Sequence, residues 1–114
     1  MRKAICLLIK NENKYLNEWV RWHLTQDFNH FYIYNTGTED PKEVLKNFNP
    51  YLFTIIDWRN KYYFNMQIEA YSDCLKKARQ NQEEWLAFID IDEFIYIPKN
   101  LLEETNEDIS VIYL

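Results

Sequence analysis

The sequence has only one glycine, Gly37, in 114 residues. A Walker loop and a dinucleotide-binding fingerprint each need several glycines, because their backbones approach phosphate groups closely. Both motifs are therefore excluded. If the protein binds a nucleotide diphosphate, a metal ion or basic side chains must meet most of its charge.

Cysteine and positive charge are also scarce. Cys6 and Cys74 are too few for a disulfide framework or a zinc-finger spacing, and we expect both to be buried thiols. The 13 basic residues are scattered and are outnumbered by 18 acidic ones, which argues against a nucleic-acid-binding surface. The first apolar run, Ala4 to Ile9, is too short for a transmembrane segment and lacks a signal-peptide cleavage pattern. The expected compartment is therefore the cytoplasm.

The remaining pattern is that of one globular domain, residues 1–114, in which apolar runs alternate with amphipathic segments. Runs of β-forming residues predict strands at 4–9, 31–34, 52–56 and 85–89, and a final one at 108–113. Helical spacing predicts helices at 16–24, at 40–48 and, with an apolar stripe of Ile68, Tyr71, Cys74, Leu75 and Ala78, at 68–78. This alternation predicts an α/β fold with a mostly parallel sheet and helices on both faces.

Polar residues follow each of the first four predicted strands at its carboxyl end. Ligands of open α/β sheets bind at these ends, where the strand order reverses. The four groups are Lys10, Asn11 and Glu12; Asn35, Thr36, Gly37 and Thr38; Asp57 and Arg59; and Asp90, Asp92 and Glu93. Gln67 in the third predicted helix is a further polar candidate, and the aromatic cluster Tyr62, Tyr63 and Phe64 before it could stack on a sugar or pack in the core. We expect the four strand ends to form one site.

The D-x-D motif of Asp90 and Asp92 is the most specific signal. In an extended backbone, residues two apart point the same way, so both carboxylates are expected on one side, with Ile89 and Ile91 facing the core. Two carboxylates suit Mn²⁺ or Mg²⁺, which can share its remaining positions with phosphate oxygens. A bare D-x-D also occurs in solvated acidic turns. We favour a metal site, because burying two carboxylates between apolar runs is costly without a cation.

Several candidate residues also have structural interpretations. Glu12 stands at an expected helix start, where the helix dipole stabilises a carboxylate. Asn35 could bind a base or ribose, or simply start a turn, and Lys10 could contact a phosphate or be exposed. His23 falls on an apolar stripe and is expected to be a packing residue, while His30 precedes its strand, at the opposite end of the sheet from the site.

Three parts of the sequence resemble the family 2-like and family 92-like glycosyltransferases in order and spacing: residues 5–12 with 16–24, residues 32–40, and residues 85–94. The resemblance covers about residues 5–98 and implies a GT-A fold, a UDP- or GDP-sugar donor and a divalent metal. In such families the D-x-D pair, here Asp90 and Asp92, holds Mn²⁺ or Mg²⁺ on the donor diphosphate. Asn11, Glu12 and the turn after the second strand would frame the nucleoside. Together with the strand-end pattern, this makes Lys10, Asn11, Glu12, Asn35, Gly37, Asp57, Gln67 and Asp90 the expected nucleotide-sugar contacts.

The sequence departs from the family pattern in two places. The family's acidic turn is here Asn35-Thr-Gly-Thr38, which leaves the donor base open. GT-A enzymes also continue beyond the D-x-D strand, so we expect residues 1–114 to be the nucleotide-sugar-binding half, truncated after that region. The acceptor-binding half and the general base would then be absent, and Glu93 is not assigned as the base.

The expected activity is metal-dependent transfer of a sugar, with inversion, to an acceptor hydroxyl on a glycan, a lipid-linked molecule or a protein. One alternative is a truncated or degenerate, non-catalytic nucleotide-sugar-binding or interaction domain, whose uncovered sheet edge would favour self-association. A second is a metal-dependent phosphohydrolase or nucleotidyltransferase, since these enzymes also use clustered carboxylates.

Overall fold

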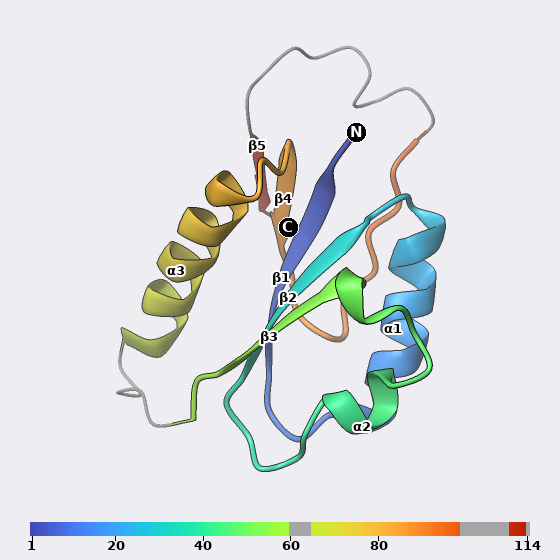
Figure 1. Cartoon of the computed structure of the whole chain (residues 1–114), viewed down its shortest axis with the longest axis vertical. Coiled ribbons are helices and arrows are strands. Elements are labelled where there is room, and N and C mark those ends of the chain that lie inside the picture. The colour runs from blue at the N-terminus through green and yellow to red at the C-terminus, as the bar shows by residue number, and fades with distance from the viewer. Residues whose placement is uncertain (60–64, 99–109, 114) are drawn as a thin grey trace.

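The protein forms one parallel sheet with helices on both sides (Figure 1). The computed structural model describes residues 1–59, 65–98 and 110–113, the last as backbone only. The elements are β1 (Lys3–Ile9), α1 (Asn13–Thr25), β2 (His30–Asn35), α2 (Lys42–Leu45), the 3-10 helix η1 (Pro50–Leu52), β3 (Phe53–Asp57), α3 (Met66–Gln80), β4 (Trp85–Phe88) and β5 (Ser110–Tyr113). The strand order is β3-β2-β1-β4-β5, and every neighbouring pair is parallel. The predicted α/β class is confirmed.

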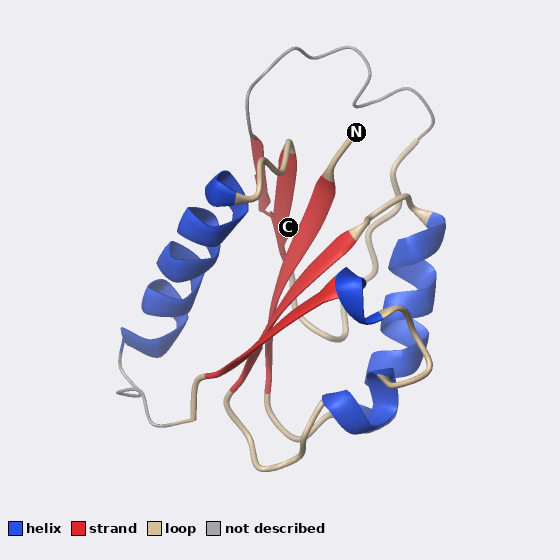
Figure 2. Ribbon diagram, in the orientation of Figure 1, coloured by secondary structure: helices blue, strands red, loops and turns tan. Residues whose placement is uncertain are grey.

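The sheet separates two hydrophobic clusters, because successive side chains of a strand point to opposite faces. On one face, Ile5, Leu7 and Ile9 of β1 pack with Leu16 and Trp19 of α1. On the other face, the cluster contains Ala4 and Cys6 of β1 and Ala70, Cys74 and Ala78 of α3. Figure 2 shows α1 and α2 on one side of the sheet and α3 on the other. The result is a three-layer arrangement that leaves the carboxyl ends of the strands accessible.

Two predicted helices differ from the structure. Ile68, expected on the apolar stripe of α3, is 71% exposed. The rest of the predicted stripe does face the sheet: Cys74 and Ala78 are buried there, and Tyr71 and Leu75 pack against the same cluster. Ala70 takes the place expected of Ile68, because a residue two positions from Ala70 is on the other side of a helix with 3.6 residues per turn. Helix α2 spans Lys42–Leu45 and does not reach residue 48. The chain turns there towards η1, whose Pro50 cannot continue a helix.

Both cysteines are buried and free, as predicted. Burial raises the pKa of the Cys6 thiol well above its usual value. No helix within residues 1–59 and 65–98 has the length and apolar character needed to cross a bilayer. The backbone of 110–113 confirms the last predicted strand in part, while residues 108 and 109 lie outside the described residues.

Candidate functional site

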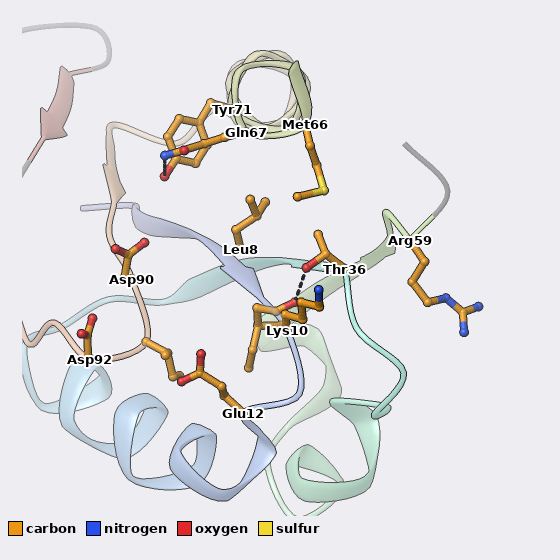
Figure 3. Close-up of a pocket in the computed structure, with 12 residues that line it drawn as sticks. Leu8, Lys10, Glu12, Thr36, Arg59, Met66, Gln67, Tyr71, Asp90 and Asp92 are labelled. Carbon is orange, nitrogen blue, oxygen red and sulfur yellow. Dashed lines mark hydrogen bonds between the residues drawn. The ribbon is translucent and has the colours of Figure 1, made fainter. Parts of the chain in front are cut away.

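A cavity lies where the strand order of the sheet reverses. The chain runs outward through β1, β2 and β3, and β4 then pairs with the other side of β1. The reversal is therefore between β1 and β4, the position at which α/β sheets bind ligands. The cavity has a volume of about 560 Å³, within the usual range for small-molecule sites. It is lined by Leu8, Ile9, Lys10, Glu12, Thr36, Arg59, Met66, Gln67, Tyr71, Asp90, Ile91 and Asp92 (Figure 3).

Part of this lining could be predicted from the sequence. Of the predicted contacts, the structure brings together Lys10, Glu12, Gln67, Asp90 and Asp92. The strand register explains this convergence, because Ile9 of β1, Asn35 of β2 and Asp57 of β3 are aligned at one edge. The aromatic cluster Tyr62, Tyr63 and Phe64 lies outside the described residues.

Thr36 and Arg59, expected at the strand ends, also line the cavity, whereas Met66 and Tyr71 were not predicted as contacts. Met66 and Tyr71 belong to the first turns of α3, where Gln67 Nε2 donates to Tyr71 Oη at 3.0 Å. The four-residue spacing from the predicted Gln67 was the signal available for Tyr71. Thr36 Oγ1 donates to the carbonyl of Ile9 at 3.0 Å and so ties the ends of β1 and β2 together.

The D-x-D motif lies in a turn. Glu93 N donates to the carbonyl of Asp90 at 3.1 Å, and Asp90 N donates to Glu93 Oε1 at 2.8 Å. Ile91 is buried, whereas Asp90 and Asp92 are exposed and line the cavity. The expectation of an extended segment with buried carboxylates is thus wrong, because β4 ends at Phe88 and the chain then turns. The desolvation argument for a metal does not apply, although the two carboxylates do share one cavity.

Negative charge is concentrated around Asp90. Partial burial, the Glu93 carboxylate and the Asp92 carboxylate together raise the pKa of Asp90 above its usual value. Like charges in one place favour binding of a cation or a proton. The described side chains include no group of three or more His, Cys, Asp or Glu placed to hold a metal ion together. A Mg²⁺ site of the kind that shares the ion with substrate phosphates needs only one or two protein carboxylates, and Asp90 and Asp92 are the carboxylates of this turn that line the cavity.

Basic residues complete the cavity. In Figure 3, Asp90 and Asp92 lie on one side of Lys10, and Arg59 lies on the other side. Arg59 Nη2 and Nε lie 2.6 and 2.8 Å from the two Asp57 carboxylate oxygens. These contacts lower the pKa of Asp57 to about 2. The cavity therefore has carboxylates at one end and a guanidinium at the other.

A second, smaller cavity of about 250 Å³ adjoins the first, since Arg59 lines both. Its lining consists of Asn35, Thr38, Asp40, Lys42, Ile55, Asp57 and Arg59. The predicted contacts Asn35 and Asp57 therefore lie beside the main cavity and not in it.

Gly37 lies in the turn between β2 and α2, Asn11 between β1 and α1 supports that turn with its side chain, and neither residue lines either cavity. Asn11 has a positive φ of 53°, and its Oδ1 accepts from Thr38 N at 2.7 Å and Glu39 N at 2.9 Å. A Cβ on Gly37 would lie 2.5 Å from Asn11 Oδ1, so this close approach requires glycine. Asn35 Oδ1 accepts from Gly37 N at 3.0 Å, which gives Asn35 the turn role that the sequence left open.

Both histidines lie away from the cavity lining. His23 is fully buried; its Nε2 accepts from Ile95 N at 3.0 Å and its Nδ1 lies 2.8 Å from the carbonyl of Trp19. Burial lowers the pKa of His23 to about 4. The predicted packing role of His23 is confirmed, and His30 is at the amino end of β2, as expected.

Comparison with known proteins places this geometry in context. A sequence profile of glycosyltransferase family 92 matches residues 4–111. The chain is 28% identical over 98 residues to glycosyltransferase family 92 protein Os08g0121900 of Oryza sativa subsp. japonica, covering 85% of the chain and 16% of that protein. It is 32% identical over 108 residues to galactan beta-1,4-galactosyltransferase GALS1 of Arabidopsis thaliana, a match that covers 84% of the chain and 21% of that protein. It is 33% identical over 95 residues to galactan beta-1,4-galactosyltransferase GALS2 of the same plant, which covers 73% of the chain and 18% of that protein. The chain thus spans between 16% and 21% of the length of these relatives.

Proposed function

Because the chain belongs to glycosyltransferase family 92, we propose that it forms the nucleotide-sugar-binding part of a metal-dependent glycosyltransferase. The proposed reaction of the whole protein is transfer of a sugar from the nucleotide to an acceptor hydroxyl, with inversion at the anomeric carbon. The observation that supports this proposal most directly is the presence of Asp90 and Asp92 together in the cavity at the strand-order reversal. That position suits a donor diphosphate.

Different residues of the cavity would bind different parts of the donor. Asp90 and Asp92 would hold Mn²⁺ or Mg²⁺, and the bound ion would neutralise charge that develops on the leaving diphosphate. Lys10 brings positive charge to the same cavity and would contact phosphate oxygens, whereas the charge of Arg59 is already balanced by Asp57. Gln67 offers an amide from α3 for the sugar or the diphosphate.

The adjoining cavity would take the ribose or the base of the donor. Asn35, Asp57 and Arg59 are among the polar residues that line it and would be the nearest side chains to that part of the donor. The donor base stays open between UDP and GDP. Two of the relatives are named galactosyltransferases, which supports UDP-galactose as the first donor to assay.

Calorimetric titration with UDP and with GDP, each with and without Mn²⁺, tests donor binding. We expect tighter binding in Mn²⁺ and a loss of roughly tenfold or more in Asp92→Asn, the effect of removing one charge-assisted interaction. Glu43→Gln is the matched control, since it removes one negative charge from an exposed position on α2 outside both cavities. Equal binding by the wild type and Asp92→Asn would exclude the metal assignment.

Turnover separates the proposed enzyme from its alternatives. Sugar transfer or sugar-nucleotide hydrolysis by the purified chain would exclude a purely non-catalytic binding domain. Release of inorganic phosphate from simple phosphate esters would favour a phosphohydrolase.

A further inference from the structure

The segment that carries the D-x-D motif continues along one side of α1 (Figure 1). Residues 93–98 have neither helical nor strand hydrogen bonding, so their backbone polar groups must find partners elsewhere. Side chains of α1 and of its C-cap residue Gln26 supply several of these partners. Trp22 Nε1 donates to the carbonyl of Ile95 at 2.8 Å, and Gln26 Oε1 accepts from Ile97 N at 2.9 Å.

His23 and Trp19 of α1 add further hydrogen bonds to the same segment. His23 Nε2 accepts from Ile95 N at 3.0 Å. Trp19 Nε1 donates to the carbonyls of Asp90 and Glu93, at 3.2 and 3.0 Å. The four side chains are Trp19, Trp22, His23 and Gln26, which follow the i, i+3, i+4, i+7 spacing of one helix face. We call this set the α1 clamp.

Trp19 contacts the acidic turn itself. Its side chain is fully buried, and its ring packs against His23 and Phe31 at centroid distances of 4.6 and 5.7 Å. The position of the indole N–H is therefore set by the core. This N–H is shared between the carbonyls of Asp90 and Glu93, the first and last residues of the turn.

The turn has reason to need such support. Asp90 and Asp92 are exposed on the cavity side, and together with Glu93 they place three carboxylates within four consecutive residues, whose like charges repel one another. Within the turn, the hydrogen bonds between Asp90 and Glu93 oppose this repulsion. The Trp19 N–H holds both ends of the turn from the core side.

We propose that Trp19 is a positioning residue for the metal site, and that the other three side chains of the α1 clamp hold the segment that follows it. The proposal rests on the function proposed above. A site that is competent in only part of the molecules binds its ligand more weakly by that fraction. Releasing the turn should therefore weaken metal-dependent nucleotide binding while leaving metal-free binding unchanged.

Trp19→Phe tests this, because it removes the indole N–H and keeps an aromatic ring in the core. We expect the affinity for UDP in Mn²⁺ to fall on the order of tenfold, and the affinity in EDTA to stay at the wild-type value; GDP replaces UDP if the wild type prefers it. Trp85→Phe is the matched control. It makes the same change at the start of β4, away from the carboxyl ends of the strands.

Hydrogen exchange provides a second readout that needs no ligand. The Asp90 amide donates to Glu93 within the turn, and the Ile95 amide donates to His23. We expect both amides to exchange faster in Trp19→Phe, with the amides of β2 unchanged. If Trp19 had only a structural role, Trp19→Phe would lower the stability of the whole protein without this local pattern of faster exchange.

The outcomes separate the two proposals. A wild type with no Mn²⁺-dependent affinity contradicts the proposed function, and exchange at Asp90 then still tests the α1 clamp. If Trp19→Phe keeps the Mn²⁺-dependent affinity of the wild type and its amides exchange at the wild-type rate, the positioning role is overturned. If Trp19→Phe does not fold, Trp22→Phe decides in the same way. It removes one N–H from a side chain that is already 37% exposed, and we expect faster exchange of Ile95 and a loss of roughly threefold in Mn²⁺-dependent affinity.

Discussion

Acidification should destabilise the protein through His23. This side chain has no exposed surface, and its Nε2 must stay unprotonated to accept from Ile95 N. Burial lowers its pKa from 6.5 to about 4. The unfolded chain therefore binds a proton first as the pH falls. The stability contributed by neutral His23 is fully present above pH 6.5, and it is lost as the pH falls from 6.5 towards 4.

The size of this effect follows from the two pKa values. With 6.5 in the unfolded chain and about 4 in the folded one, the loss relative to neutral pH is about 2 kcal/mol at pH 5 and approaches about 3 kcal/mol below pH 4. A domain has a total stability of about 5–15 kcal/mol. The predicted loss is thus large enough to measure.

Urea unfolding of the wild type and of His23→Gln at pH 7, 6 and 5 isolates this contribution. Glutamine does not titrate, and other groups that titrate in this range, including His30, are common to both proteins. We expect the free-energy difference between wild type and variant to shrink by about 2 kcal/mol from pH 7 to pH 5. A difference that stays constant over this range would refute the reasoning.

Three further substitutions or reactions test the packing. Gly37→Ala should lower the free energy of unfolding by about 1–3 kcal/mol, because its Cβ would lie 2.5 Å from Asn11 Oδ1; an unchanged urea midpoint would contradict the close approach. Ile68→Gln should change that free energy by less than about 0.5 kcal/mol, since Ile68 is 71% exposed, and a larger loss would point to burial. Cys6 and Cys74 are buried and should react with a thiol reagent such as Ellman's only after denaturation, so rapid reaction of the native protein would argue against their burial.

Much of the fold could be predicted because its main signals are local. A strand buried on both faces is a nearly continuous apolar run, and residues 4–9 fall within β1 (Lys3–Ile9) for this reason. The buried face of α1 also follows its helical spacing. The buried face of α3 was predicted at Tyr71, Cys74, Leu75 and Ala78. It was wrong at Ile68 and missed Ala70, because a small residue contributes little to an apolar stripe although it allows close packing on the sheet.

The site was predictable in outline and not in conformation. Parallel strands bring their carboxyl ends to one edge, which is why Lys10 and Asp90 could be expected near one another. The carbonyl of Asp90 accepts a hydrogen bond from Trp19, which is 71 positions away in the sequence. Such long-range contacts leave no local pattern, so the exposure of the two carboxylates could not be read from the D-x-D motif.

An anomalous difference map from crystals grown with Mn²⁺ and UDP, or GDP if the protein prefers it, is the most direct test of the central claim. The account predicts a manganese peak bridging the carboxylates of Asp90 and Asp92 and the nucleotide diphosphate, in the cavity between β1 and β4. Nucleotide in this cavity without manganese at Asp90 and Asp92, or manganese bound only elsewhere, would contradict it.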